Sequence, residues 1–323
     1  ANFNGKIALS GGKFSKITSK DASLTVADML APNYLCCDAN GKRISYAELR
    51  KTELENFTVV KCAVHEDGDS DGFCDYCNAN LEADSAAKVK TEAGVTTYYA
   101  DLKTAFEKVS AGGTITLLNN ATLTEGITVE KSITLDLNGK TITGQVKGAL
   151  LTVAASVTIR NDGNAGGLAN TVENEYTVQV STGGTLTVTG GTFGDPNMGG
   201  AALRGDTGSD ITLSGGTFER SVFIYGKAKI TNGQFNGGVV IDKGSAFISG
   251  GKFTATVTLN NVSKVLTGGT FTDGISGDKP LHELLVDGYA FKRSGENGAW
   301  LTEEERAQNE FQESVTVTKA PIT

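Results

Sequence analysis

The sequence predicts an all-β fold, a right-handed single-stranded parallel β-helix with small helical caps. Three observations lead to this prediction. A short strand motif recurs along the chain, each copy ends in a Gly-x-Phe turn, and the 323 residues include 41 glycines but only 4 prolines. Abundant Gly without Pro and without a collagen period is typical of many tight turns between short strands.

The recurring motif has the pattern apolar-x-apolar-[Ser/Thr]-[Gly/Asn]-Gly-x-Phe. Its alternation indicates a strand, and its Gly supplies a turn with positive φ at low steric cost. One unit is too short to bury its own apolar side, so we expect the units to stack at about 4.8 Å per coil. The motif ends once at Phe14 and then, in the second half of the chain, at Phe193, Phe218, Phe235, Phe253 and Phe271.

Stacking of equivalent positions predicts two internal ladders. The five Phe residues that end the later motifs, Phe193, Phe218, Phe235, Phe253 and Phe271, form one of them. The other is expected to contain the central apolar residue of each motif, namely Val188, Leu213, Ile230, Ile248 and Leu266. Because parallel crossovers are right-handed in about 98% of cases, we expect a right-handed helix. A β-sandwich is the alternative, since its hairpins also use Gly.

The ends of a stack of coils need covers. Apolar residues at helical spacing over residues 102–109, with Asp101 as a possible cap, predict an amphipathic helix over the first coil. The interval from Phe14 to Gly41 equals that from Phe271 to Gly298, 27 residues in each case, with similar residues between. We therefore expect four segments. They are residues 1–60, the last coil and exit cap of a preceding β-helix unit; 61–83, a Cys/Asp-rich metal-binding linker; 84–301, a parallel β-helix with an N-terminal helical cap; and 302–323, a linker to a following domain.

All five cysteines lie before residue 78, and two Cys/His pairs have spacers of two residues. The pairs are Cys62 with His65 and Cys74 with Cys77, which predicts a closed structural Zn²⁺ site with three thiolates and one imidazole. In an exported protein a disulfide among these three cysteines is the alternative. The adjacent residues 36 and 37 are also cysteines, and the sequence assigns them no role.

An acidic loop lies between the two pairs. Asp67, Asp69 and Asp71 follow the D-x-D-x-D-G start of a calcium loop, and Asp75 stands at position nine, so we predict these four residues as Ca²⁺ ligands. At position twelve Asn78 replaces the bidentate acid, so binding would be weak or would need ligands from elsewhere. A solvated acidic loop is the alternative.

Several stretches of the chain resemble a known family. Residues 98–106, 113–118 and 133–142 resemble the start of pectate-lyase-like β-helix domains in large surface proteins of Gram-positive gut bacteria, and residues 62–77 are similar to short elements that punctuate such proteins. The resemblance covers roughly residues 61–301. It implies a β-helix and an extracellular location, on the cell surface or associated with the cell wall. It implies no single activity, because the family includes enzymes and non-enzymes.

Charge and composition exclude some classes of function. A net charge of −8, with no cluster of basic residues, argues against nucleic-acid binding. No run of 18 apolar residues is present, so we expect no membrane span in this sequence. Carboxylates in the predicted coils stand in turn contexts such as Asp195-Pro196, which turn chemistry explains without catalysis.

We therefore expect a monomeric, non-catalytic structural or adhesive module of an exported bacterial surface protein. Its partner would be a carbohydrate or a host surface, and we predict no catalytic residues. A carbohydrate-active enzyme of the β-helix type, either a polysaccharide lyase or a glycoside hydrolase, is the alternative. A phage tail-spike is a third hypothesis, and it would require a trimer.

Overall fold

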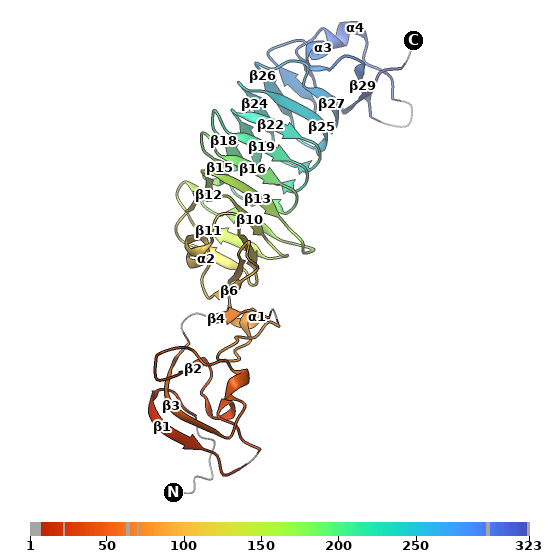
Figure 1. The fold of residues 1–323 in the computed structure, drawn as a ribbon. Coiled ribbons are helices and arrows are strands. Elements are labelled where there is room, and N and C mark those ends of the chain that lie inside the picture. Colours follow the sequence, from red (N-terminus) through yellow and green to blue (C-terminus); the bar gives the residue numbers. More distant parts are fainter. Residues whose placement is uncertain (1–7, 22, 63–64, 70, 295–297, 322–323) are drawn as a thin grey trace. The chain divides into compact units, whose positions relative to one another are not determined.

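The computed structural model describes residues 8–21, 23–62, 65–69, 71–294 and 298–321. The chain divides into two compact units, residues 1–109 and 110–323, which Figure 1 draws from red to blue. Strands dominate both units, and every helix is short. Among the described residues, no helix has the length and apolar character that crossing a membrane requires.

The second unit contains a parallel β-helix of about 8 turns, as the sequence predicts (Figure 1). Three parallel sheets run along it. The first contains β7 (Thr114–Leu117), β10 (Ile133–Asp136), β13 (Ser156–Arg160), β16 (Thr185–Val188), β19 (Asp210–Leu213), β22 (Lys227–Ile230), β25 (Ala246–Phe253) and β27 (Leu266–Phe271). The second contains β8 (Ala121–Leu123), β11 (Thr141–Gly144), β14 (Gly167–Asn170), β17 (Thr192–Phe193), β20 (Thr217–Phe218), β23 (Gln234–Phe235) and the ends of β25 and β27. The third contains β9 (Ile127–Val129), β12 (Ala149–Val153), β15 (Tyr176–Val180), β18 (Ala201–Gly205), β21 (Ser221–Ile224), β24 (Val239–Asp242), β26 (Val257–Asn260) and β28 (Ile275–Gly277).

The core of this unit is built from the two predicted ladders. Each motif Phe pairs in register with the next, and the four successive ring pairs stack with centroids 5.0, 5.0, 4.6 and 4.9 Å apart. The aliphatic ladder from Val188 to Leu266 is also in register, and all five of its side chains are fully buried. Both predictions are confirmed.

The Gly pair of the motif is required by the backbone. Gly251 has φ +103°, which side-chain-bearing residues rarely adopt. A Cβ at Gly250 would lie 2.2 Å from the carbonyl oxygen of Thr231 on the preceding coil. The absence of a side chain therefore lets successive coils approach closely at this turn.

The last coil is closed by antiparallel strands and short helices. The strand β31 (Val315–Lys319) lies between β27 and β29 (Tyr289–Arg293), and β30 (Glu310–Phe311) pairs with β28. The helices are α3 (Leu281–Leu284) and α4 (Glu303–Arg306). We expected residues 302–323 to form a linker, but the described part of that segment instead supplies α4, β30 and β31, because β31 pairs with strands that are distant in sequence.

Residues 8–62 of the first unit form a small antiparallel sheet. Its strand order is β1 (Gly12–Thr18), β3 (Glu53–Lys61), β2 (Tyr34–Cys37), and its turns include the 3₁₀ helices η1 (Ala27–Met29) and η2 (Ala47–Leu49). Its core contains Val26, Cys36, Leu49, Phe57 and Val59.

The remainder of the first unit contains β4 (His65–Asp67), α1 (Leu81–Asp84), β5 (Ala87–Lys90), β6 (Thr96–Tyr99) and α2 (Leu102–Lys108). The helix predicted over residues 102–109 is present as α2. Its N-terminus is capped by Asp101, whose carboxylate accepts the N–H of Thr104 at 2.8 Å. The buried side of α2 carries Leu102, Ala105 and Phe106.

Candidate metal centre

The four predicted zinc ligands come from three positions in the first unit. Cys62 directly follows β3, and its N–H donates to the carbonyl of Asn33 at 2.7 Å. His65 opens β4. Cys74 and Cys77 lie on the turn that follows β4.

Backbone hydrogen bonds on both sides of Cys74 hold that turn in a tight loop. The N–H of Cys74 donates to Ala79 and the N–H of Asn78 donates back to Cys74, at 3.0 and 2.8 Å. Asn78 has φ +53°, a conformation that Asn tolerates better than most residues. The N–H of Asp75 donates to the carbonyl of Glu66, 2.9 Å away, which attaches the turn to the strand that carries His65. Local hydrogen bonds therefore bring both ligand pairs together.

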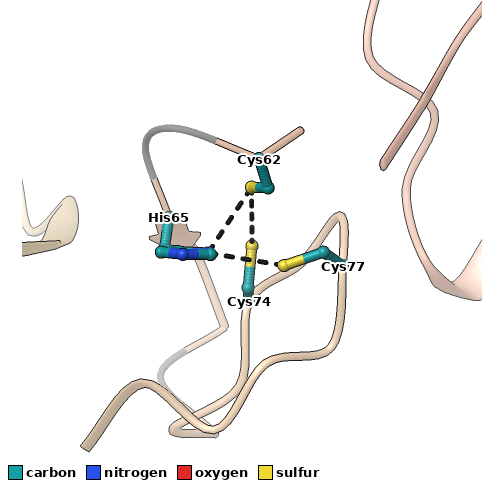
Figure 2. Close-up of side chains that lie close together, drawn as sticks. All are labelled: Cys62, His65, Cys74 and Cys77. Carbon is teal, nitrogen blue, oxygen red and sulfur yellow. Dashed lines mark hydrogen bonds between the residues drawn. The ribbon is translucent and has the colours of Figure 1, made fainter. Parts of the chain in front are cut away.

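The distances between the donor atoms fit a tetrahedral ion. Cys62 Sγ lies 3.9 Å from Cys74 Sγ, and His65 Nδ1 lies 3.4 Å from the Sγ atoms of both Cys62 and Cys77 (Figure 2). Zinc with its usual bond lengths would place two sulfurs about 3.8 Å apart and a sulfur and a nitrogen about 3.6 Å apart. A disulfide needs about 2.05 Å. All five cysteines are free thiols, and the ligand atoms of the four residues all lie within 4.8 Å of one another.

The contacts within the cluster shift the pKa values of its cysteines and of His65 in different directions. Hydrogen bonds from the thiols of Cys62 and Cys77, and a weaker one from His65, lower the pKa of Cys74. The hydrogen bond to Cys74 raises the pKa of Cys62, with Cys77 and burial acting in the same direction. Hydrogen bonds to Cys74 and Cys77 raise the pKa of His65 to about 9. These shifts favour a thiolate at Cys74 and an imidazolium at His65 in the metal-free cluster, and a bound divalent cation would take the place of the protons.

The acidic loop brings together three of its four predicted ligands. Carboxylate oxygens of Asp67, Asp69 and Asp71 lie within 4.8 Å of one another. Asp69 and Asp71 are exposed, whereas Asp67 is buried. The carboxylate of Asp67 accepts the hydroxyl of Tyr98 at 2.9 Å and the N–H groups of Asp71 and Gly72 at 3.0 Å.

The fourth predicted ligand lies outside that group. Asp75 Oδ2 accepts the N–H of Gly68 at 2.8 Å, which closes the loop from the other side. The N–H of Asp71 acts to lower the pKa of Asp69, but desolvation and the neighbouring charges of Asp71 and Asp75 outweigh it, and the pKa is raised. The loop therefore concentrates negative charge on three neighbouring carboxylates.

Two residues that support the site were not found from the sequence. Tyr98 lies on β6 and donates a hydrogen bond to the buried Asp67 from 31 positions away, and burial together with this hydrogen bond raises the pKa of Tyr98. Asn33 fixes Cys62 through its carbonyl. Neither contact leaves a local pattern in the sequence.

The adjacent cysteines of β2 are not part of the cluster. Cys36 is fully buried in the small apolar core. Burial, with a smaller effect from Cys37, raises the pKa of Cys36 to about 12. We conclude that Cys36 packs as a small apolar residue, since a thiolate would be strongly disfavoured there.

Searches against protein-family models, curated proteins and solved structures find no significant match to the chain. The link to pectate-lyase-like surface domains therefore stays a resemblance that rests on sequence motifs. The structure itself supports a parallel β-helix and a Cys₃His cluster that could hold a metal ion such as zinc.

Proposed function

We propose that the chain is a non-catalytic structural module of an exported bacterial surface protein, in which a stiff β-helix follows a small unit that binds a structural zinc ion. The observation that carries this proposal is the continuous core of the β-helix. Its Phe and aliphatic ladders are fully buried and in register over successive coils. A core that repeats without interruption suits a module whose role is mechanical extension or display.

Several carboxylates along the coils support this proposal because they bind neighbouring groups. Asp136 is buried and pairs with Arg160 at 3.1 Å. Asp242 accepts the side-chain amide of Asn261 at 2.7 Å. Asp206 accepts both Arg204 at 2.8 Å and Gln179 at 2.7 Å. Such fixed partners give the coils stability, whereas a general acid or base must be able to reach a substrate.

Zinc is the proposed ion of the Cys₃His cluster because the ligand types and the spacing of the donor atoms both suit it. Bound zinc would tie the end of β3 to β4 and to the following turn. Since the ligands fill all four tetrahedral positions, its role would be structural.

We propose weak binding of Ca²⁺ for the acidic loop. Three clustered carboxylates favour a hard cation, but Asp75 Oδ2 accepts a backbone N–H, and Asn78 stands where a bidentate acid would complete the loop. Asp75 therefore stands apart from the three clustered carboxylates. Isothermal titration with Ca²⁺, repeated on the Asp69→Asn variant, tests this. Equal heats for the two proteins would exclude specific binding at the loop.

The metal proposal is tested by elemental analysis and a thiol count on protein purified without chelator. We expect one zinc per chain and five reactive thiols after denaturation in chelator. Protein without zinc whose cysteines are disulfide-bonded would overturn it.

The structural role is tested separately, by pulling single molecules and by a screen of polysaccharides for released products. We expect the β-helix to unfold in steps of one or a few coils, and no product to appear. Product released by the chain would instead support the carbohydrate-active alternative. Binding to a glycan array without turnover would refine the proposal to an adhesive module.

A further inference from the structure

We infer that residues 8–62 are a second copy of the element that closes the β-helix, and that the outer edge of β1 is a docking surface for a coil of another parallel β-helix unit. The first indication is the strand order. In the N-terminal copy β3 lies between β1 and β2, and in the C-terminal copy β31 lies between β27 and β29. All four pairings are antiparallel.

The registers of the two sheets agree. Phe14 pairs with Phe57 in the first copy, and Phe271 pairs with Val315 in the second. Four residues further along each middle strand, Lys61 pairs with Tyr34 and Lys319 pairs with Tyr289. A slip of one residue would have inverted the faces of the strand, so this agreement is a strong sign of a shared structure.

Backbone hydrogen bonds outside the strands are repeated as well. The N–H of Cys62 donates to Asn33 at 2.7 Å, as the N–H of Ala320 donates to Gly288 at 2.9 Å. Asn33 and Gly288 both have positive φ, 64° and 84°. In addition, the N–H of Ile44 donates to Cys36 at 2.9 Å, as that of Leu301 donates to Phe291 at 3.1 Å.

A reciprocal pair of side-chain to backbone hydrogen bonds recurs at the short helix of each copy, and in the second copy it forms a capping box. Ser45 and Glu48 exchange side-chain to backbone hydrogen bonds ahead of η2, at 3.1 and 3.3 Å. Thr302 and Glu305 exchange the same pair ahead of α4, at 2.9 and 3.3 Å.

A parallel bridge links the start of each copy to the segment after its first helix. The bridges join Leu9 to Leu30 and Leu266 to Leu285. In the second copy this bridge belongs to the last coil of the β-helix. By equivalence, residues 8–14 take the position of a last coil in the first copy.

The copies differ at one edge, and this difference points to the occupant. The strand β27 pairs with β25 on its other side, and the fully buried ring of Phe271 stacks on Phe253. Within the described part of the chain, β1 pairs with β3 alone. Phe14 stacks on Phe57 at 5.1 Å but is only half-buried.

An unpaired strand edge recruits another strand, and the partner that fits is a parallel coil with the same turn. Its Phe would stack on the free side of Phe14 as Phe253 stacks on Phe271. The edge would thus join this chain to a further β-helix unit, so that such units follow one another in tandem.

A register-matched graft tests the inference. Residues 210–264 are placed directly before Ala8 of the chain, so that Lys264 is followed by Ala8 as it is natively followed by Val265. The control carries the same 55 residues in scrambled order. Hydrogen exchange is then measured for the amides of β1 and of the graft.

We expect the β1 amides that do not bond to β3 to exchange at least about tenfold more slowly in the graft than in the scrambled control. We also expect the grafted coils to be protected. If the graft folds and β1 exchanges as in the control, the edge does not accept a coil. If the graft itself stays unprotected, the edge fails to template it. Either result would overturn the inference.

Discussion

At the residue scale, identical side chains take different roles because their surroundings differ. Cys36 and Cys74 are both buried thiols. The apolar core around Cys36 raises its pKa, whereas hydrogen bonds from Cys62 and Cys77 lower that of Cys74. The sequence predicted the metal cluster because its ligands lie close together in the chain. It could not reveal Tyr98, whose contact depends on the pairing of β4 with β6.

The first prediction concerns Cys74→Ser, with Cys36→Ala as the matched control. Loss of one thiolate should reduce zinc affinity by more than the 10–100-fold that is typical when a residue hydrogen-bonded to a metal ligand is replaced. The control should retain one zinc per chain, since Cys36 lies outside the cluster. Metal content after dialysis against a competing chelator distinguishes the two. Equal zinc retention by both variants would show that Cys74 is not a ligand.

The second prediction concerns pH. In the metal-free protein, the protonated form of His65 stabilises the fold. This contribution is complete below about pH 6.5 and is lost as the pH rises through the raised pKa of about 9. The lowered pKa of Cys74 has the opposite effect, because its stabilisation is complete above the ordinary thiol value of 9.0 and is lost as pH falls. The two slopes oppose each other between about 6.5 and 9.

Zinc removes this balance because its ligands must be deprotonated. The gain in unfolding free energy on adding zinc should therefore shrink as pH falls from about 8 to about 5.5. Denaturant titrations of zinc-loaded and chelator-treated protein measure that gain. A gain that stays constant over this range would contradict the thiolate and imidazole ligand set.

The third prediction concerns the Phe ladder. Phe235→Ala should lower the free energy of unfolding by about 3–5 kcal/mol, because the ring is fully buried between two others. Phe247 is 41% exposed, so Phe247→Ala should change stability by no more than about 0.5 kcal/mol. Thermal or denaturant melts compare the two. Similar losses for both variants would place Phe235 outside the core.

At the scale of the elements, alternation and turn residues predicted the strands of the coils well. Each strand repeats the same local pattern, so the sequence contains the signal many times. The exit cap was harder to predict. Residues 315–318 alternate Val with Thr, which predicts a strand. Its partners, β27 and β29, pair with it in the antiparallel sense, and the local sequence does not indicate which strands it pairs with.

The fourth prediction concerns the irregular part of β25, where the strand passes from the first sheet to the second. Gly250→Ala places a Cβ 2.2 Å from the carbonyl oxygen of Thr231 and should destabilise the protein by more than about 1 kcal/mol. Gly238→Ala is the control, because its Cβ would lie 3.6 Å from the nearest atom, the carbonyl oxygen of Thr256. The control should be neutral or slightly stabilising. A neutral Gly250→Ala would mean that the coils are not in close contact there.

At the scale of the whole molecule, the repeat determines the architecture of residues 110–323. The need to bury short apolar strands predicts stacking, and the structure shows it. The right-handed sense of the coils stays a prediction from the general preference of parallel crossovers. Function was less predictable from the sequence. The residues that recur from coil to coil are those that pack the core, and a role at the cell surface requires no such recurring residues. The agreement between the two cap copies was visible as equal spacing, but their shared registers required the structure.

The most direct test of the central claim, in-register parallel stacking, is a set of distances between spin labels. The first sheet aligns Thr114, Thr134, Thr158, Thr187, Thr212, Lys229 and Phe247 in one column. Labels attached through non-natural amino acids, which leave the cysteines intact, are placed at Thr114 and at Thr212, Lys229 or Phe247. The mean distances should be about 19, 24 and 29 Å, rising by about 4.8 Å per coil. Distances that do not rise by one strand spacing from pair to pair would contradict the β-helix.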